Sequence, residues 1–248
     1  MEKLTVKPTF VKTANVRNAE AMMAGLALAD GEGRFGLVYG RAGRGKTRWS
    51  QYYVANNRNC HYVLALKVWR SSLGELLKRI AVEIGITAPP SRIGALFTQV
   101  AERMVKTRPA LFIDEPEKLT IGHIEILRDL TEATAAPIIL IGEDELPEMM
   151  RSHRRVWSRT YQQIQFRPFG VADIVQYVTA SAGIRFVNQA AAEAMHKASD
   201  GDIRIVRRDL INLVQILNAK GVAEADEKTV KAAIRQALHE DGDMGGTV

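Results

Sequence analysis

The sequence is poor in cysteine and in aromatic residues. Among its 248 residues, Cys60 is the single cysteine, and aromatic residues make up 6%. A single cysteine excludes a disulfide within the chain. It also argues against a metal site built from cysteine and histidine, because the five histidines show no ligand spacing. Cys60 is expected to be a small buried residue rather than a nucleophile.

Long hydrophobic runs are also missing. No apolar run approaches the roughly 20 residues that cross a bilayer, and the N-terminal stretch lacks the apolar core of a signal peptide. We therefore expect no membrane association and a cytoplasmic location, which suits the single cysteine. Hydrophobic residues still make up 46% of the chain, enough to fill one large domain or a core domain with a small companion.

Positive charge is in excess and unevenly placed. The formal net charge is +6, the stretch "RSHRRVWSR" at 151–159 holds four arginines, and the stretch "HEDGDMGG" near the C-terminus is acidic. Such a balance is typical of proteins that bind nucleic acid, and it is equally compatible with a solubilising basic surface.

Short apolar runs alternate with helical patterns along the first two thirds of the chain. The runs occupy residues 34–40, 60–68, 110–115, 137–142 and 161–169. Between them, Ser72 with Glu75 predicts a capping box, Ser91 can cap a second helix, and Thr120 can begin a third. This alternation predicts an α/β fold with parallel strands and crossover helices.

After Phe169 the sequence shows helical patterns, each opened by Asn or Asp or closed by Gly. We therefore predict four parts: a lead-in segment at 1–33, an α/β core at 34–169, a small all-helical domain at 170–240, and a flexible tail at 241–248.

The stretch "GRAGRGKT" at 40–47 follows a predicted strand and precedes a predicted helix. It fits G-x-x-x-x-G-K-[ST], in which glycines let backbone N–H groups turn inward and form a nest for phosphate at the helix N-terminus. Lys46 would reach the β- and γ-phosphates, and the Thr47 hydroxyl would take one position on Mg²⁺. The predicted nucleotide-binding residues are Gly40, Arg41, Ala42, Gly43, Arg44, Gly45, Lys46, Thr47 and Arg48.

The stretch "ALFIDEPEKL" at 110–119 places two carboxylates at the end of a buried strand. Asp114 could hold Mg²⁺ through water, and Glu115 could polarise the attacking water as a base. Parallel strands end at one edge of a sheet, where ligands of α/β folds bind. With Lys46 and Thr47, these residues predict that the chain binds and hydrolyses ATP with Mg²⁺.

These motifs and four further segments resemble the AAA+ ATPases, in the order expected of that family. "PIILIG" resembles the strand that ends in the first sensor, and Ser158–Arg159 resembles the segment of the arginine finger, which a neighbouring subunit inserts against the γ-phosphate. "GDIR" at 201–204 resembles the second sensor, and the C-terminal helices resemble the lid. The resemblance implies a P-loop AAA+ core, with a parallel five-stranded sheet sandwiched by helices, and a small C-terminal all-α lid.

Within that family, "IDEPEKL" and "IILIGEDELPEMM" are most similar to the branch that contains MuB, TnsC, TniB and ExeA. The resemblance covers roughly residues 10–240. It implies an ATP-dependent protein that binds double-stranded DNA, associates with itself into a helical filament or ring, selects an insertion target and stimulates a transposase.

The resemblance also assigns roles to basic residues. Arg159 is predicted as the arginine finger, with Arg155 as second choice, and Arg204 as the second sensor; Arg151 and Arg154 fit either a solvated face or contacts to DNA or a subunit. Arg204 also fits an ordinary helix-surface arginine. The candidate DNA contacts are Lys67, Trp69 and Arg70 in the loop after the second strand, and Lys118 after the third, although Trp69 fits the core equally well.

Two departures from the family pattern stand out. The family's MuB has an additional N-terminal helix-turn-helix domain, for which about 33 residues before the first strand leave no room, so we expect the AAA+ body to contact DNA. The first sensor usually offers a neutral donor, but here Glu143 and Asp144 occupy that place. A carboxylate facing the γ-phosphate would repel it, so either another residue senses the phosphate or hydrolysis is slow.

Other functions remain open at this point. A helicase loader or replication initiator would use the same ATPase site, and a nucleotide-controlled signalling switch would use it without DNA. A small-molecule kinase is disfavoured because Glu115 suits activation of water and no acceptor-binding segment stands out.

Overall fold

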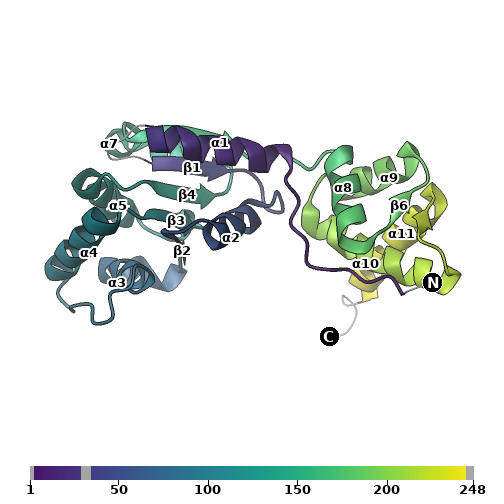
Figure 1. The fold of residues 1–248 in the computed structure, drawn as a ribbon, viewed down its shortest axis with the longest axis horizontal. Helices are drawn as coiled ribbons and strands as arrows, with labels where there is room; N and C mark the ends of the chain where they lie inside the picture. Colours follow the sequence, from purple (N-terminus) through teal and green to yellow (C-terminus); the bar gives the residue numbers. More distant parts are fainter. Residues whose placement is uncertain (1–2, 29–34, 244–248) are drawn as a thin grey trace. The chain divides into compact units, whose positions relative to one another are not determined.

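The computed structural model describes residues 3–28 and 35–243, and these fall into two compact units (Figure 1). The sheet unit comprises residues 14–28, 35–41 and 45–166. The helical unit comprises residues 3–13, the short segment Ala42–Arg44, and residues 167–243. Residues 1–2 and 29–33 of the expected lead-in, residue 34 of the expected core, and the last five residues of the expected tail lie outside the described ranges.

Five parallel strands form the centre of the sheet unit, as predicted. They are β1 (Phe35–Tyr39), β2 (Cys60–Leu64), β3 (Ala110–Asp114), β4 (Ile138–Gly142) and β5 (Thr160–Gln165), in the order β2-β3-β4-β1-β5. The inner strands β1, β3 and β4 are almost wholly buried, which explains their continuous apolar sequences. The α/β class is confirmed.

Helices cover both faces of this sheet (Figure 1). On one face, buried residues of α3 (Leu73–Glu83), α4 (Ile93–Thr107) and α5 (Ile121–Thr134) join alternate strand residues in one hydrophobic cluster. On the other face lie α1 (Ala14–Leu28) and α2 (Lys46–Asn56). The fully buried Trp49 of α2 has its ring centre 5.8 Å from that of Phe112, and α1 lies so close to β1 that a Cβ on Gly36 would sit 2.8 Å from Leu26 Cδ1.

The caps of these helices differ in part from the prediction. Thr120 and His123 form a capping box at the start of α5, as the sequence suggested for Thr120. The box predicted at Ser72 is wrong, because Glu75 instead bonds Lys78 at 2.9 Å and the Ser72 side chain makes no capping bond. Ser91 does not cap α4 either, since Arg92 occupies the cap position.

The helical unit contains α8 (Val171–Ala182), α9 (Gln189–Ser199), α10 (Ile203–Lys220) and α11 (Glu227–Asp243). Its own hydrophobic cluster includes Ile174, Met195, Leu210, Leu213 and Leu217. It is not purely helical, because β6 (Arg185–Phe186) and β7 (Glu224–Ala225) pair in parallel. Helix α11 includes the first three residues of the expected tail.

The expected lead-in segment is divided between the two units. Residues 3–13 belong to the helical unit, where Leu4 N donates to Asn218 Oδ1 at 2.8 Å and Asn218 Nδ2 donates to Leu4 O at 2.9 Å. Lys7 N donates to Ser181 O at 2.8 Å, and Val6 and Val11 pack against the hydrophobic cluster of this unit. Helix α1 belongs to the sheet unit. Within the described ranges, no helix has both the length and the apolar character needed to cross a membrane.

Short elements complete the sheet unit near the ends of its strands. Two 3₁₀ helices, η1 (Lys67–Ser71) and η2 (Pro116–Lys118), follow β2 and β3, and two short α-helices, α6 (Leu146–Arg151) and α7 (Arg154–Trp157), separate β4 from β5. Most of the residues singled out by the sequence therefore lie on connections rather than inside long helices.

Candidate functional site

The loop between β1 and α2, residues 40–47, is the predicted phosphate nest and is called the phosphate loop. Gly40, Gly43 and Gly45 have φ of 144°, 77° and 90°, values that side chains disfavour. A Cβ on Gly40 would lie 2.5 Å from Phe166 O. Both the backbone conformation and the lack of space therefore require glycine at position 40.

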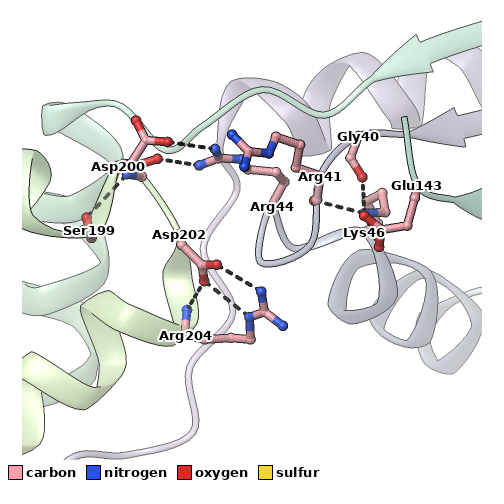
Figure 2. Close-up of polar contacts among 10 residues, drawn as sticks. Gly40, Arg41, Arg44, Lys46, Glu143, Ser199, Asp200, Asp202 and Arg204 are labelled. Carbon is pink, nitrogen blue, oxygen red and sulfur yellow. Dashed lines mark hydrogen bonds and ion pairs between the residues drawn. The ribbon is translucent and has the colours of Figure 1, made fainter. Parts of the chain in front are cut away.

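Lys46 is the first residue of α2 and is almost completely buried, with 7% of its surface exposed. Its Nζ donates to the backbone oxygens of Gly40 and Arg41, the latter at 3.0 Å, and lies 3.6 Å from Glu143 Oε1 (Figure 2). The ammonium is held by carbonyl groups of its own loop and by one carboxylate.

Asp114 ends β3 and is 2% exposed. It accepts a hydrogen bond from Tyr62 Oη at 2.7 Å and another from the Thr47 side chain. Burial raises the pKa of Asp114, although the two hydroxyl donors act in the opposite direction. The Thr47 hydroxyl and the Asp114 carboxylate are hard oxygen donors placed together, so this pair fits a magnesium ion.

Glu115 follows Asp114 in a left-handed conformation, with φ of 57°. Its backbone N–H donates to Ile141 O at 2.8 Å, which fixes the turn against β4. The half-exposed carboxylate forms an ion pair with Lys118. Lys118, predicted as a DNA contact, thus lies beside the candidate base.

Two residues at this edge were missed by the sequence analysis. Tyr62 lies on β2, the strand beside β3, and only the pairing of these strands brings it to Asp114. Glu117 lies in η2, and its Oε1 accepts a hydrogen bond from Glu143 N at 3.0 Å. Burial raises the pKa of Glu117. The spacing D-E-x-E at 114–117 was the available signal for Glu117.

The apex of the phosphate loop, Ala42–Arg44, is part of the helical unit. Arg44 is buried, donates to Asp200 O and pairs with Asp200 Oδ2 at 3.2 Å, while Ile203 N donates to Gly43 O at 3.0 Å. Arg204, the candidate second sensor, pairs with its neighbour Asp202 at 2.9 Å (Figure 2). Burial alone would raise the pKa of Asp202, but the bonds and charge of Arg204 lower it. Arg48 is exposed on α2.

The arginines of 151–159 lie on α6, on α7 and just before β5. Arg159, the candidate finger, is exposed and bonds Glu132 Oε1 at 2.9 Å within its own chain. Arg151 stacks on the Trp157 ring at 4.9 Å, and Arg154 and Arg155 are exposed. The structure therefore pairs Arg159 with Glu132 of α5 in the same chain.

The candidate DNA contacts after β2 lie on η1. Lys67 and Arg70 are exposed, whereas Trp69 packs against the hydrophobic cluster of the sheet unit. The buried His123 of α5 contacts Trp69 O through Nε2 at 3.1 Å and Thr120 Oγ1 through Nδ1 at 2.7 Å. The tryptophan therefore anchors η1, and the two cations are exposed on it together with Val68 and Ser71.

Comparison with known proteins agrees with this geometry. Residues 29–150 match the family model described as an AAA domain. The Mu-like prophage FluMu DNA transposition protein B of Haemophilus influenzae is 30% identical over 208 residues, covering 80% of this chain and 70% of that protein. The ATP-dependent target DNA activator B of Escherichia phage D108 is 25% identical over 244 residues, covering 96% of this chain and 75% of that protein.

Solved structures with the same fold are more distant in sequence. The ORC2 protein of Aeropyrum pernix aligns with a TM-score of 0.67 at 14% identity, over 96% of this chain and 70% of that chain. The RuvB Holliday junction branch migration motor of Thermotoga maritima aligns with a TM-score of 0.58 at 18% identity, over 89% and 68%. These likenesses support the P-loop fold, and the similarity to the prophage protein shows that the chain belongs to the MuB-type AAA+ ATPases.

Proposed function

We propose that this protein is an ATP-dependent, sequence-nonspecific DNA-binding ATPase that assembles on duplex DNA, serves target selection in transposition and activates a transposase. The observation that carries the ATPase part is the meeting of Thr47 and Asp114 beside the phosphate loop, with Lys46 at the start of the same helix. Glycine-bordered N–H groups, an ammonium and a carboxylate-hydroxyl pair are the groups that a magnesium triphosphate needs.

Each residue has a role in the proposed reaction. Lys46 binds the β- and γ-phosphates, and Thr47 and Asp114 hold Mg²⁺, which supplies charge neutralisation when bound. Glu115 orients the attacking water and accepts its proton. Because Glu115 pairs with Lys118 in this structure, the carboxylate has to leave that ammonium to act as a base.

The DNA-binding part of the proposal is supported by the relatives' names and by exposed cations. Lys67 and Arg70 on η1 would contact phosphates without reading bases, so binding would be independent of sequence and would weaken steeply with salt. Each subunit adds few contacts, and self-association multiplies them.

Subunit assembly would complete the site. Arg159 would leave Glu132 and approach the γ-phosphate bound by a neighbouring subunit, so that ATP holds the subunits together. Hydrolysis, stimulated by the transposase, would then release the assembly from DNA.

Retention of linear duplex DNA on filters at about 50 mM salt, with ATP, ADP or no nucleotide, tests the proposal. We expect retention with ATP and little with ADP, and two unrelated DNA sequences should behave alike. Electron microscopy of the same samples should show filaments or rings. Absence of ATP-dependent retention would favour a signalling switch without DNA. Capture of a helicase in place of a transposase would favour the loader function.

A further inference from the structure

We propose that Glu143 is a built-in competitor for the Lys46 ammonium and that Glu117 holds it in place. Nucleotide must then displace a carboxylate that already lies in the site. The inference rests on the proposed function, because it requires the triphosphate to engage Lys46.

The surroundings of Lys46 give the first reason. A buried ammonium is costly unless it is hydrogen-bonded and near a counter-charge. Gly40 O and Arg41 O supply hydrogen bonds but no net charge, whereas Glu143 Oε1, at 3.6 Å from Nζ, supplies the charge (Figure 2). Glu143 thus supplies the counter-charge that a phosphate oxygen would supply in the proposed complex with nucleotide.

Glu117 fixes the position of Glu143 by binding its backbone. Oε1 of Glu117 accepts the backbone N–H of Glu143 at 3.0 Å, at the point where β4 ends. Its other oxygen packs so closely on Gly142 that a Cβ there would lie 2.7 Å from it. Because η2, which carries Glu117, directly follows the Asp114–Glu115 turn, the contact links the magnesium-binding turn to the competitor.

Replacement of Glu143 by phosphate at Lys46 should lower the affinity for nucleotide. Phosphate binding takes Lys46 from Glu143, and the displaced carboxylate then stands near the phosphates and repels them. The affinity for nucleotide is therefore lower than the phosphate loop would give without Glu143. Glu143 is 45% exposed in its side chain, so screening limits the effect, and we expect a two- to fivefold change in affinity, about the range of a partly exposed ion pair.

The first experiment measures the dissociation constant of a fluorescent, non-hydrolysable ATP analogue with Mg²⁺ for three forms of the full chain. Glu143→Gln should bind about two- to fivefold more tightly than wild type. Glu145→Gln removes the same charge from an exposed position two residues further on, and its affinity should be unchanged. Unchanged or weaker binding by Glu143→Gln, or equal tightening by both variants, would overturn the competitor role.

The second experiment separates position from charge at Glu117. Glu117→Gln keeps an oxygen that can accept the Glu143 N–H and should stay close to wild type, whereas Glu117→Ala loses the acceptor and should tighten binding as Glu143→Gln does. The double variant Glu117→Ala/Glu143→Gln should bind no more tightly than Glu143→Gln alone, since both changes break one chain of contacts. Equal effects of Gln and Ala at Glu117 would overturn the positioning role.

Lys46→Ala distinguishes failure of the proposed ATP site from failure of the competitor role of Glu143. If it retains full nucleotide affinity, the proposed ATP site itself fails. If it loses affinity while Glu143→Gln matches wild type, the site stands and the competitor fails. Thermal unfolding of every variant checks that each one is folded.

Discussion

Lys46 and Asp114 in the sheet unit expose 7% and 2% of their surface, whereas Arg204 in the helical unit exposes 66% of its side chain and pairs with the residue two positions before it. Buried charges interact with little screening, while exposed neighbours in sequence gain little from their pairing. Arg44 and Asp209 are exceptions, because they are buried charges of the helical unit. Arg44 pairs with the distant Asp200, and Asp209 pairs with its neighbour Arg208. The buried charges of the proposed nucleotide site thus lie in the sheet unit, whereas the candidate second sensor of the helical unit lies at its surface.

Arg159 is exposed in the sheet unit, and its substitution should nevertheless change turnover more than any other substitution. Arg159→Ala should lower ATP turnover about 1,000-fold with nucleotide affinity kept, since a finger acts on the transition state of a neighbouring subunit. Phosphate release and analogue binding measure the two quantities. Arg155→Ala is the matched control. A loss of turnover in that variant and not in Arg159→Ala would identify Arg155 as the arginine finger.

Mixing provides the control for action between subunits. Arg159→Ala retains an intact site and Lys46→Ala retains an intact finger, so a mixture should recover turnover that neither variant shows alone. A mixture as inactive as its components would argue against the shared site.

Glu115→Gln is the second prediction. It should reduce turnover about 100-fold or more, because general base catalysis typically contributes 10²–10⁴-fold, and DNA retention with ATP should persist for longer. The same substitution at the exposed Glu125 of α5 should leave turnover at the wild-type rate. Wild-type turnover by Glu115→Gln would remove Glu115 from the base role.

Lys46→Ala tests the buried ammonium of the sheet unit. We expect nucleotide affinity to fall about 10- to 100-fold, the range for losing a charge-assisted contact and leaving groups unpaired. Titration of a fluorescent nucleotide measures it, with Lys106→Ala, an exposed lysine of α4, as the control. Equal affinities of the two variants would contradict the role of Lys46 in phosphate binding.

Arg204→Ala should have the smallest effect, a reduction of turnover by less than about tenfold, because its side chain is exposed and its partner Asp202 screens it. The same phosphate-release measurement checks this. A loss as large as that of Glu115→Gln would show that the helical unit takes a direct part in the chemistry.

The strands and the phosphate loop were predictable from sequence because their signals are local. Continuous apolar runs mark the inner strands β3 and β4, and glycine spacing marks the turn before Lys46. Both signals depend on neighbouring residues alone, so no tertiary contact was needed to find them.

Three features were missed for different physical reasons: a long-range contact, a helix cap and a short strand pair. Tyr62 reaches Asp114 only through the register of β2 with β3, which no pattern in either stretch specifies. The cap predicted at Ser72 was wrong because Glu75 had a competing partner, Lys78, one turn further on. The β6–β7 pair has two residues in each strand, too few to leave a periodic signal.

The attachment of residues 3–13 to the helical unit bears on how that unit can be isolated. A fragment that starts at residue 167 would uncover the apolar surface under Leu4, Val6 and Val11 and would leave the Asn218 amide without its two backbone partners. Such a fragment should be unstable alone, and a synthetic peptide of residues 3–13 supplied separately should raise its melting temperature.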